Sequence, residues 1–136
     1  MEMYDQGLFT TGQIDSLLKL RLVLLFTENP WLRMNTITAR QRVGESPWAL
    51  SEALDELADA GFLVAGERFG QREYWLTALP DRRIRLERLA RTFDDPQRRD
   101  DIYDLTRAAS DERRFHELGA PRLRAMAVGE FDGFVF

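Results

Sequence analysis

The stretch TITARQRVGESPWALSEALDELADAGFLV, residues 36–64, decides the fold. It predicts a short helix over residues 36–43 that ends at Gly44, a residue suited to the left-handed position after a helix. Ser46 and Pro47 then begin a second helix, because serine accepts hydrogen bonds from free backbone amides and proline is tolerated in the first turn. Gly61 ends this second helix, and one apolar face recurs along it at helical spacing: Leu50, Ala53, Leu54 and Leu57.

Two short runs with high β propensity follow, residues 62–64 (Phe-Leu-Val) and residues 74–76 (Tyr-Trp-Leu). The polar segment 67–72 between them contains Gly70, so the pattern predicts a β-hairpin with this segment as its tip. Residues 14–77 are therefore expected to form three helices and a hairpin around one core that includes Leu50, Leu54, Leu57, Leu63 and Leu76.

The strings SPWALSEAL (46–54), AGFLV (60–64) and REYWLT (72–77) together resemble the winged helix-turn-helix of bacterial transcriptional regulators, in the style of the MarR and PadR groups. The resemblance implies a mainly α fold with a small β-hairpin wing (α+β). In such a fold the helix from Ser46 enters the major groove of DNA and the wing grips its flank. We expect a winged helix-turn-helix domain over residues 14–92 and a C-terminal helical extension over 93–136, used for dimerisation or docking.

The segment before the decisive stretch predicts a first helix over residues 14–26. It is apolar on all sides, which is typical of a central helix or of a subunit interface. With Leu20 and Leu24 opposite the core stripe, this helix is expected to supply part of a homodimer interface, together with the chain after Asp81. Trp31 and Leu32 are expected to form a buried linker that extends into a short first strand.

Further helices are expected after the hairpin. One begins at Pro80 and runs to about Phe93, where Asp94-Asp95-Pro96 stops it. In the extension, the pattern predicts a helix over 97–109, a further turn or two from Ser110 closed by Gly119, and a last helix from Ala120.

Composition narrows the class of protein. The chain has 136 residues, no cysteine and a single histidine, which excludes disulfides and a thiolate metal site and leaves too few imidazoles for a histidine metal cluster. No P-loop, dinucleotide glycine motif or nucleophile elbow is present, and His116 lies among charged residues. We therefore expect no enzyme, no metal and no cofactor. The longest apolar run, residues 22–26, is too short for a membrane span, and the first residues lack a basic leader, so a cytoplasmic protein is expected.

Charge is distributed unevenly along the chain. The net charge is −4, and residues 46–80 alone carry two basic and six acidic side chains. The helix and hairpin that should face DNA are thus acidic, which is the wrong sign for contact with phosphates. Electropositive candidates lie beside them: Arg40 and Arg42 on the short helix, and Arg68 and Arg72 at the hairpin tip. Lys19, Arg21 and Arg33 are candidates to extend that surface.

Within the helix from Ser46, the candidate DNA contacts are Ser46, Trp48, Ser51 and Glu52. Serine donates to phosphate, although Ser46 is first of all a helix cap, and glutamate accepts from the exocyclic amine of cytosine. Glu52 is equally consistent with solvated helix surface beside Asp55, Glu56 and Asp59. Trp48 is consistent with stacking in a groove, with packing on the preceding helix, or with a protein contact.

Two functions therefore remain open. The first is a dimeric transcriptional regulator that binds double-stranded DNA through the winged helix-turn-helix. The second is a winged-helix module that binds another protein through Trp48 and the acidic helix face and does not bind DNA. The resemblance favours the first, and the charge distribution favours the second.

Overall fold

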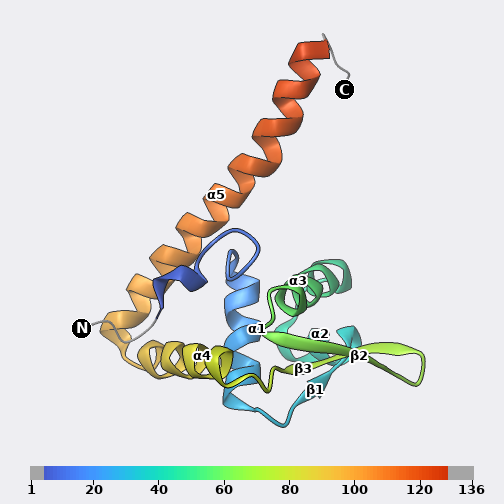
Figure 1. Ribbon diagram of the computed structural model, residues 1–136, viewed down its shortest axis with the longest axis vertical. Coiled ribbons are helices and arrows are strands. Elements are labelled where there is room, and N and C mark those ends of the chain that lie inside the picture. The colour runs from blue at the N-terminus through green and yellow to red at the C-terminus, as the bar shows by residue number, and fades with distance from the viewer. Residues whose placement is uncertain (1–4, 129–136) are drawn as a thin grey trace.

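The computed structural model describes residues 5–128, with side chains described as far as residue 117. The described chain is mainly helical with one small antiparallel sheet of three strands, in agreement with the expected α+β class (Figure 1). The elements in chain order are η1 (Gln6–Leu8), α1 (Leu17–Glu28), β1 (Arg33–Met34), α2 (Thr36–Val43), α3 (Pro47–Asp59), β2 (Leu63–Arg68), β3 (Gln71–Leu76), α4 (Pro80–Phe93) and α5 (Pro96–Val128).

Local capping signals set the ends of α2 and α3, as the sequence predicts. Asn35 and Thr38 form a reciprocal capping box at the start of α2, and Gly44 ends this helix in the left-handed conformation with φ 81°. The Ser46 hydroxyl accepts a hydrogen bond from the Ala49 amide at 3.2 Å and so caps α3. The bounds of α4, Pro80–Phe93, also confirm the expected helix.

The sheet has the strand order β1-β3-β2, and the hairpin in it is longer than expected. Segment 67–72 is not a loop, because Glu67 pairs with Arg72 and Arg68 pairs with Gln71. Only Phe69 and Gly70 form the turn, with φ 54° and 76°. A two-residue turn with positive φ at both positions matches the right-handed twist of the strands, so the ladder continues to its last possible pair.

The linker before β1 differs from the expectation that it is buried. Trp31 is 77% exposed and Leu32 is half-buried, while Met34 on β1 takes the core position at 1% exposure. The amide of Leu32 donates to the Asn29 carbonyl at 2.9 Å. This bond closes a turn after α1, and the turn directs the Trp31 side chain into solvent.

The core forms around α1, which packs against α3, α4 and α5. The five leucines expected in one core, at positions 50, 54, 57, 63 and 76, are all at most 4% exposed. Leu20 and Leu24 are also buried inside the chain, at 1% and 9% exposure, so they do not supply a dimer interface as expected. Their face of α1 is covered because other helices of the same chain pack on it.

The segment before α1 is part of the core rather than part of the helix. The helix begins at Leu17, not at Ile14, because the Ser16 hydroxyl accepts from the Lys19 amide and caps it there. Ile14 is fully buried, and so is Leu8 in η1, while Phe9 is 7% exposed. The chain before α1 therefore lies against the helices and adds to the packed interior.

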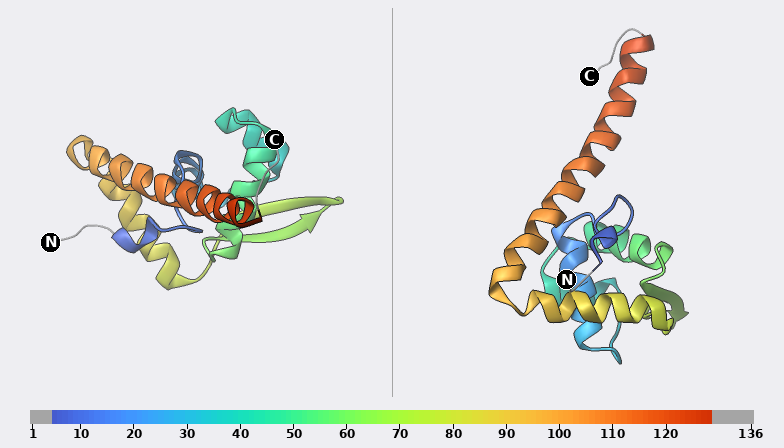
Figure 2. Two further views of the ribbon diagram at one scale, coloured as in Figure 1. Left: turned by 90° about the horizontal axis from the view of Figure 1, so that it is seen from above. Right: turned by 60° about the vertical axis from the view of Figure 1, so that its left-hand side comes forward.

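α5 is one continuous helix, whereas the sequence predicted three separate ones. Ser110 does not restart a helix, because Ile102, Thr106, Ala109 and then Arg113 form one uninterrupted face toward the rest of the chain. The backbone remains helical through Gly119 and Pro121, although both residues disfavour a helix interior. The first half of α5 packs on α1 and α4, and Arg113 near its middle contacts Glu56 on α3. Beyond residue 117 the helix extends away from the other elements (Figures 1 and 2).

None of the helices in residues 5–128 combines the length and the apolar character that crossing a membrane requires.

Candidate functional site

The predicted DNA-contacting residues lie on three elements that pack together: α2, α3 and the β2–β3 hairpin. Arg40 and Arg42 on α2 are exposed, and neither forms an ion pair within the described residues. A nearby arginine is used differently, since Arg21 on α1 donates to the Val43 carbonyl at 3.1 Å and covers the end of α2. Two free cations thus remain on the surface of α2.

Trp48 is the one aromatic side chain among the candidate DNA contacts, and it is exposed. It is the second residue of α3 and is 83% exposed, so it does not pack against the preceding helix. Of the other candidates on α3, Ser46 is occupied as the helix cap, while Ser51 is half-buried. The first turn of α3 therefore presents the indole ring of Trp48 to solvent and carries no charged side chain.

The sequence alone is consistent with a solvated acidic surface on α3, but three of the four carboxylates of this helix have basic partners. Glu52 is 59% exposed, and one of its oxygens lies 3.8 Å from Nη2 of Arg113 on α5. Asp55 accepts a hydrogen bond from Nε of Arg72 on β3 at 2.9 Å. Glu56 binds two cations and is described with its partners below. Each of these three acids therefore has a basic partner, and their charge is partly neutralised within the fold.

Asp55, Arg72 and Tyr74 join α3 to the hairpin. The Tyr74 hydroxyl donates to the same Asp55 oxygen that Arg72 contacts, and Nε of Arg72 also lies 3.1 Å from the Tyr74 oxygen. Burial, and then the Asp55 carboxylate, raise the pKa of the Tyr74 hydroxyl to about 12. The hydrogen bond to Tyr74 and the charge of Asp55 raise the pKa of Arg72 above its usual value. This linkage holds β3 beside α3.

Arg72 is consequently less available to DNA than expected, although its side chain remains 56% exposed. Arg68 at the end of β2 is freer. It is 61% exposed, with its nearest carboxylate, that of Glu73, 4.0 Å away. Its guanidinium carbon lies 5.3 Å from the centre of the Phe69 ring at the turn. Arg33 on β1 lies 4.2 Å above the Trp75 ring and 3.6 Å from Glu73, so it is engaged within the sheet.

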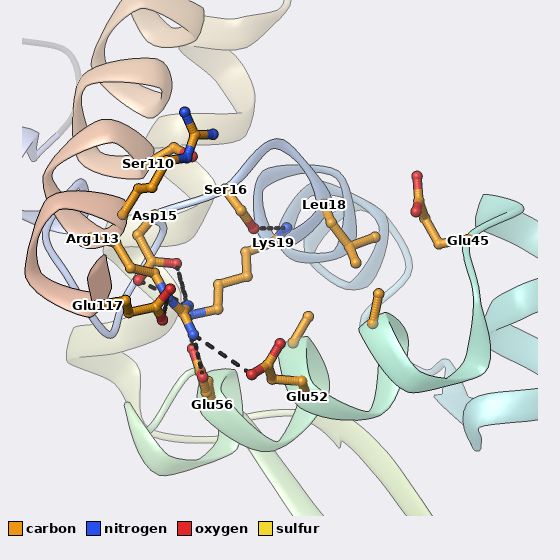
Figure 3. Close-up of a pocket in the computed structure, with 13 residues that line it drawn as sticks. Asp15, Ser16, Leu18, Lys19, Glu45, Glu52, Glu56, Ser110, Arg113 and Glu117 are labelled. Atoms are coloured by element: carbon orange, nitrogen blue, oxygen red, sulfur yellow. Dashed lines mark hydrogen bonds and ion pairs between the residues drawn. The ribbon is translucent and has the colours of Figure 1, made fainter. Parts of the chain in front are cut away.

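A second group of charges lies between α1, α3 and α5. The side chains of Asp15, Lys19, Glu56 and Arg113 point toward one another from the chain before α1 and from these three helices (Figure 3). Lys19 Nζ lies 2.8 Å from Asp15 and also contacts Glu56. Arg113 binds Glu56 at two points, with Nη1–Oε1 at 2.6 Å and Nη2–Oε2 at 2.7 Å. We call these four residues the buried charge cluster.

Two members of this cluster are fully buried. Asp15 and Lys19 are 0% and 1% exposed, so neither belongs to the electropositive surface that the sequence suggested for Lys19. Asp15 also accepts from the Gly12 amide at 2.7 Å and from Nη1 of Arg113 at 3.2 Å. Buried charges are tolerated when they are paired and their remaining lone pairs are satisfied. The cluster meets that condition with two acids and two bases.

The pKa values of the cluster follow from these contacts. Burial alone would raise the pKa of the Glu56 carboxyl, but hydrogen bonds from Arg113 and Lys19 outweigh burial and hold this pKa below its usual range. The hydrogen bond from Arg113 to Glu56 raises the pKa of Arg113 far above its usual value, against the opposing effect of burial. Both shifts favour the charged forms of Glu56 and Arg113.

A pocket of about 420 Å³ opens beside the cluster, between α1, α3 and α5 (Figure 3). Its rim carries Glu45, Glu52, Glu117 and Arg114. Sequence reasoning missed this arrangement because its members come from three segments that are far apart in the chain. The only local signal is the spacing of Asp15 and Lys19, four residues apart, which suits an ion pair on a helix.

Within residues 5–117, no group of three histidine, cysteine or acidic side chains is arranged to hold a metal ion. His116 is exposed, and its ring lies 6.1 Å from that of Phe115. Comparison of the chain with protein-family models, with curated proteins and with solved structures found no match.

Proposed function

We propose that this chain is a DNA-binding transcriptional regulator, that it folds as a winged helix-turn-helix, and that it acts as a dimer. The observation that carries the proposal is the linkage of Asp55 to Arg72 and Tyr74, which ties the hairpin beside the exposed first turns of α3. In a winged helix the recognition helix and the wing must act on the duplex together, one in the major groove and one at its flank. A fixed hairpin beside α3 suits that geometry.

The order of elements supports the same proposal. A short strand, two helices separated by three residues, and a hairpin follow α1, and β1 pairs with β3 at the far side from β2. We assign α2 and α3 as the helix-turn-helix and the β2–β3 hairpin as the wing. Arg40 and Arg42 on α2 and Arg68 on the wing are exposed, and we assign them to phosphate contacts.

The acidic character of α3 argues less strongly against DNA binding than the sequence suggested. Glu52, Asp55 and Glu56 each have an arginine partner inside the chain. Their repulsion of phosphates is therefore reduced, and the role left for α3 is close contact with base edges and sugars through Trp48, Ser51 and the outward edge of Glu52. Non-specific attraction then comes from the arginines of α2 and the wing.

The competing function is a protein-binding module, and the exposure of Trp48 favours it. A tryptophan that is 83% exposed at the start of a helix is a common anchor in protein interfaces. In that function Trp48 would insert into an apolar pocket of a partner, and no duplex would bind. The two functions therefore make opposite predictions for DNA.

A titration of labelled duplex fragments at low and moderate salt tests the proposal. We expect binding that weakens with salt, because arginine–phosphate contacts release condensed counterions. Each single replacement of Arg40, Arg42 or Arg68 by alanine should lower the slope of log affinity against log salt by about one. These variants should weaken all sequences alike, whereas changes at Ser51 or Glu52 should alter the preference between sequences.

Arg91→Ala is the matched control, because Arg91 is an exposed arginine at the end of α4, away from α2 and the wing. It should leave the salt slope unchanged. Arg72→Ala is a poorer probe, since it also breaks the contact with Asp55. If the wild-type chain binds no duplex at low salt, the regulator function is wrong, and loss of a protein partner in Trp48→Ala would then support the competing function.

A further inference from the structure

We propose that Phe69 is a wedge that enters the minor groove and partly unstacks one base step of the bound duplex. This inference rests on the proposed DNA-binding function and deepens it, because it assigns a deformation of the DNA to one residue of the wing. Its first basis is the conformation of Phe69, and its second is the chemistry of the side chains around it.

Phe69 occupies a position that its side chain does not suit. It is 92% exposed, and its φ of 54° lies in the left-handed region. A two-residue turn of this type favours asparagine or aspartate followed by glycine, because their short polar side chains tolerate positive φ. Phenylalanine gains neither burial nor local hydrogen bonding there. The left-handed φ is unfavourable for phenylalanine, and so is exposure of its ring to water. A contact between this ring and another molecule would account for both.

The side chains around Phe69 are those that read a minor groove. Asn35 donates to Gln71 at 2.7 Å, and these two amides together with Arg68 and Glu73 line a hollow of about 340 Å³ next to the ring. Minor-groove proteins combine arginine, asparagine and glutamine contacts with an inserted apolar side chain. The turn supplies the same combination.

The one carboxylate in this hollow does not oppose the assignment. Glu73 is 15% exposed, and Arg33 and Arg68 lie 3.6 Å and 4.0 Å from it, so its charge is partly neutralised. Arg68 lies 61% exposed beside the Phe69 ring, where it can follow the ring toward phosphate or into the groove. The tip therefore carries a cation and an aromatic ring together.

The hairpin is also stiff enough to hold a wedge in place. Its strands pair without interruption from Leu63 with Leu76 to Arg68 with Gln71, directly at the turn. Below the tip, Arg72 and Tyr74 fix β3 to Asp55 on α3. Unstacking a base step costs free energy, and a side chain on a rigid, anchored hairpin loses little freedom on insertion.

The test uses a duplex selected from a random pool by the full-length wild-type chain. One form of this duplex carries donor and acceptor dyes at its ends, and a second carries 2-aminopurine within the site. With the wild type we expect energy transfer to rise as the duplex bends, and 2-aminopurine fluorescence to rise as its stacking is lost. With Phe69→Asn we expect both signals to be lost and affinity to fall roughly tenfold, the effect of removing one aromatic–base stack.

Phe69→Asn is a sharp variant because asparagine suits the turn, so its thermal stability should equal or exceed that of the wild type. Phe69→Leu keeps an apolar wedge and should retain part of the bend. Trp31→Ala is the matched control, since Trp31 is an exposed aromatic residue just before β1. Arg33 of β1 pairs with Trp75, which lies at the opposite end of β3 from the tip. Trp31→Ala should leave bend and affinity unchanged.

The outcomes separate this inference from the function on which it rests. If the wild type binds a duplex and Phe69→Asn bends it equally and binds it with equal affinity, the wedge is wrong and the DNA-binding function stands. If the wild type binds no duplex at low salt, both are wrong, and Phe69 is then a contact for another kind of partner.

Discussion

Arg113 on α5 and Glu56 on α3 are joined by two parallel contacts, Nη1–Oε1 at 2.6 Å and Nη2–Oε2 at 2.7 Å. A two-point contact between guanidinium and carboxylate fixes direction as well as distance. The long helix that projects from the chain is therefore tied to the helix that we assign to the major groove. Any change in the angle of α5 must break or move this pair.

Replacing Arg113 by glutamine should lower the free energy of unfolding by about 2 kcal/mol, because it leaves Glu56 and the buried Asp15 with one cation between them. The expected loss is moderate since the Arg113 and Glu56 side chains are 20% and 28% exposed. Urea denaturation measures it. Arg107→Gln is the control, as its pair with Asp104 is about 70% exposed and should be worth less than about 0.5 kcal/mol. Equal losses in the two variants would contradict a special role for Arg113.

Protonation of Glu56 should lower the free energy of unfolding in acid. Its pKa is held below the usual value of 4.5, so its ionised form stabilises the fold at pH values above about 4.5, and this stabilisation is lost as the pH falls through the lowered pKa. The difference in free energy of unfolding between the wild type and Glu56→Gln should accordingly shrink as the pH is lowered from 6 toward about 3. A difference that is constant over this range would show that Glu56 is not held ionised by Arg113 and Lys19.

Tyr74 should affect the stability of the fold at alkaline pH. Its pKa is raised from 10.0 to about 12, so the folded chain keeps the phenol proton after the unfolded chain has lost it. The resulting stabilisation is complete below pH 10 and is lost between pH 10 and about 12. Tyr74→Phe should reduce the decline of stability over that interval. Ultraviolet absorbance follows phenolate formation directly, and it would contradict this account if the signal lost in Tyr74→Phe belonged to a group that ionises near pH 10.

Leu54 tests the packing of α3 on the core. It is fully buried, and Leu54→Ala should lower the free energy of unfolding by roughly 2–5 kcal/mol through lost apolar burial and the cavity left behind. Val64→Ala provides a comparison, because Val64 lies on the open face of the sheet at 37% exposure and should cost much less. Similar costs for the two variants would be inconsistent with Leu54 as a core residue.

Helix boundaries and buried faces can be predicted from the sequence where the residues that determine them lie within one short segment. Gly44 and Ser46 set the boundary between α2 and α3 through their own backbone preference and hydroxyl group, and no distant contact is needed. The apolar spacing of α3 likewise identifies its buried face. The turn at Phe69 was harder to locate, because a phenylalanine at positive φ runs against the preference on which turn prediction depends.

The candidate site was only partly predictable, because its decisive contacts join distant segments. Asp55 and Glu56 are adjacent acids in the sequence, yet one binds β3 and the other binds α1 and α5. Charge counting along the chain cannot tell such paired acids from solvated ones. The continuity of α5 also depends on contacts with distant segments. Ser110 caps a helix only where the preceding helix ends, and the packing of Ala109 and Arg113 on the rest of the chain keeps α5 continuous there.

The proposed dimer cannot use the buried Leu20 and Leu24 of α1, so we place its interface on α5. Leu20 and Leu24 are covered by the chain itself, while α5 beyond residue 117 stands clear of the other elements (Figure 2). An isolated helix gains little stability in water, so a helix that projects in this way is best stabilised by packing on a second copy. Phe115, which is 73% exposed at the point where α5 leaves the rest of the chain, is the described apolar residue best placed for that contact.

Phe115→Asp should therefore shift the chain from dimer toward monomer, because a dimer would have to bury the new carboxylates without partners. Sedimentation equilibrium at micromolar concentrations measures the shift. Leu79→Asp is the matched control, since Leu79 is 53% exposed at the start of α4, far from α5, and aspartate suits a helix cap. A wild-type monomer at micromolar concentration and above would contradict the dimer, and with it two half-sites related by a two-fold axis. A dimer unaffected by Phe115→Asp would instead place the interface on another surface.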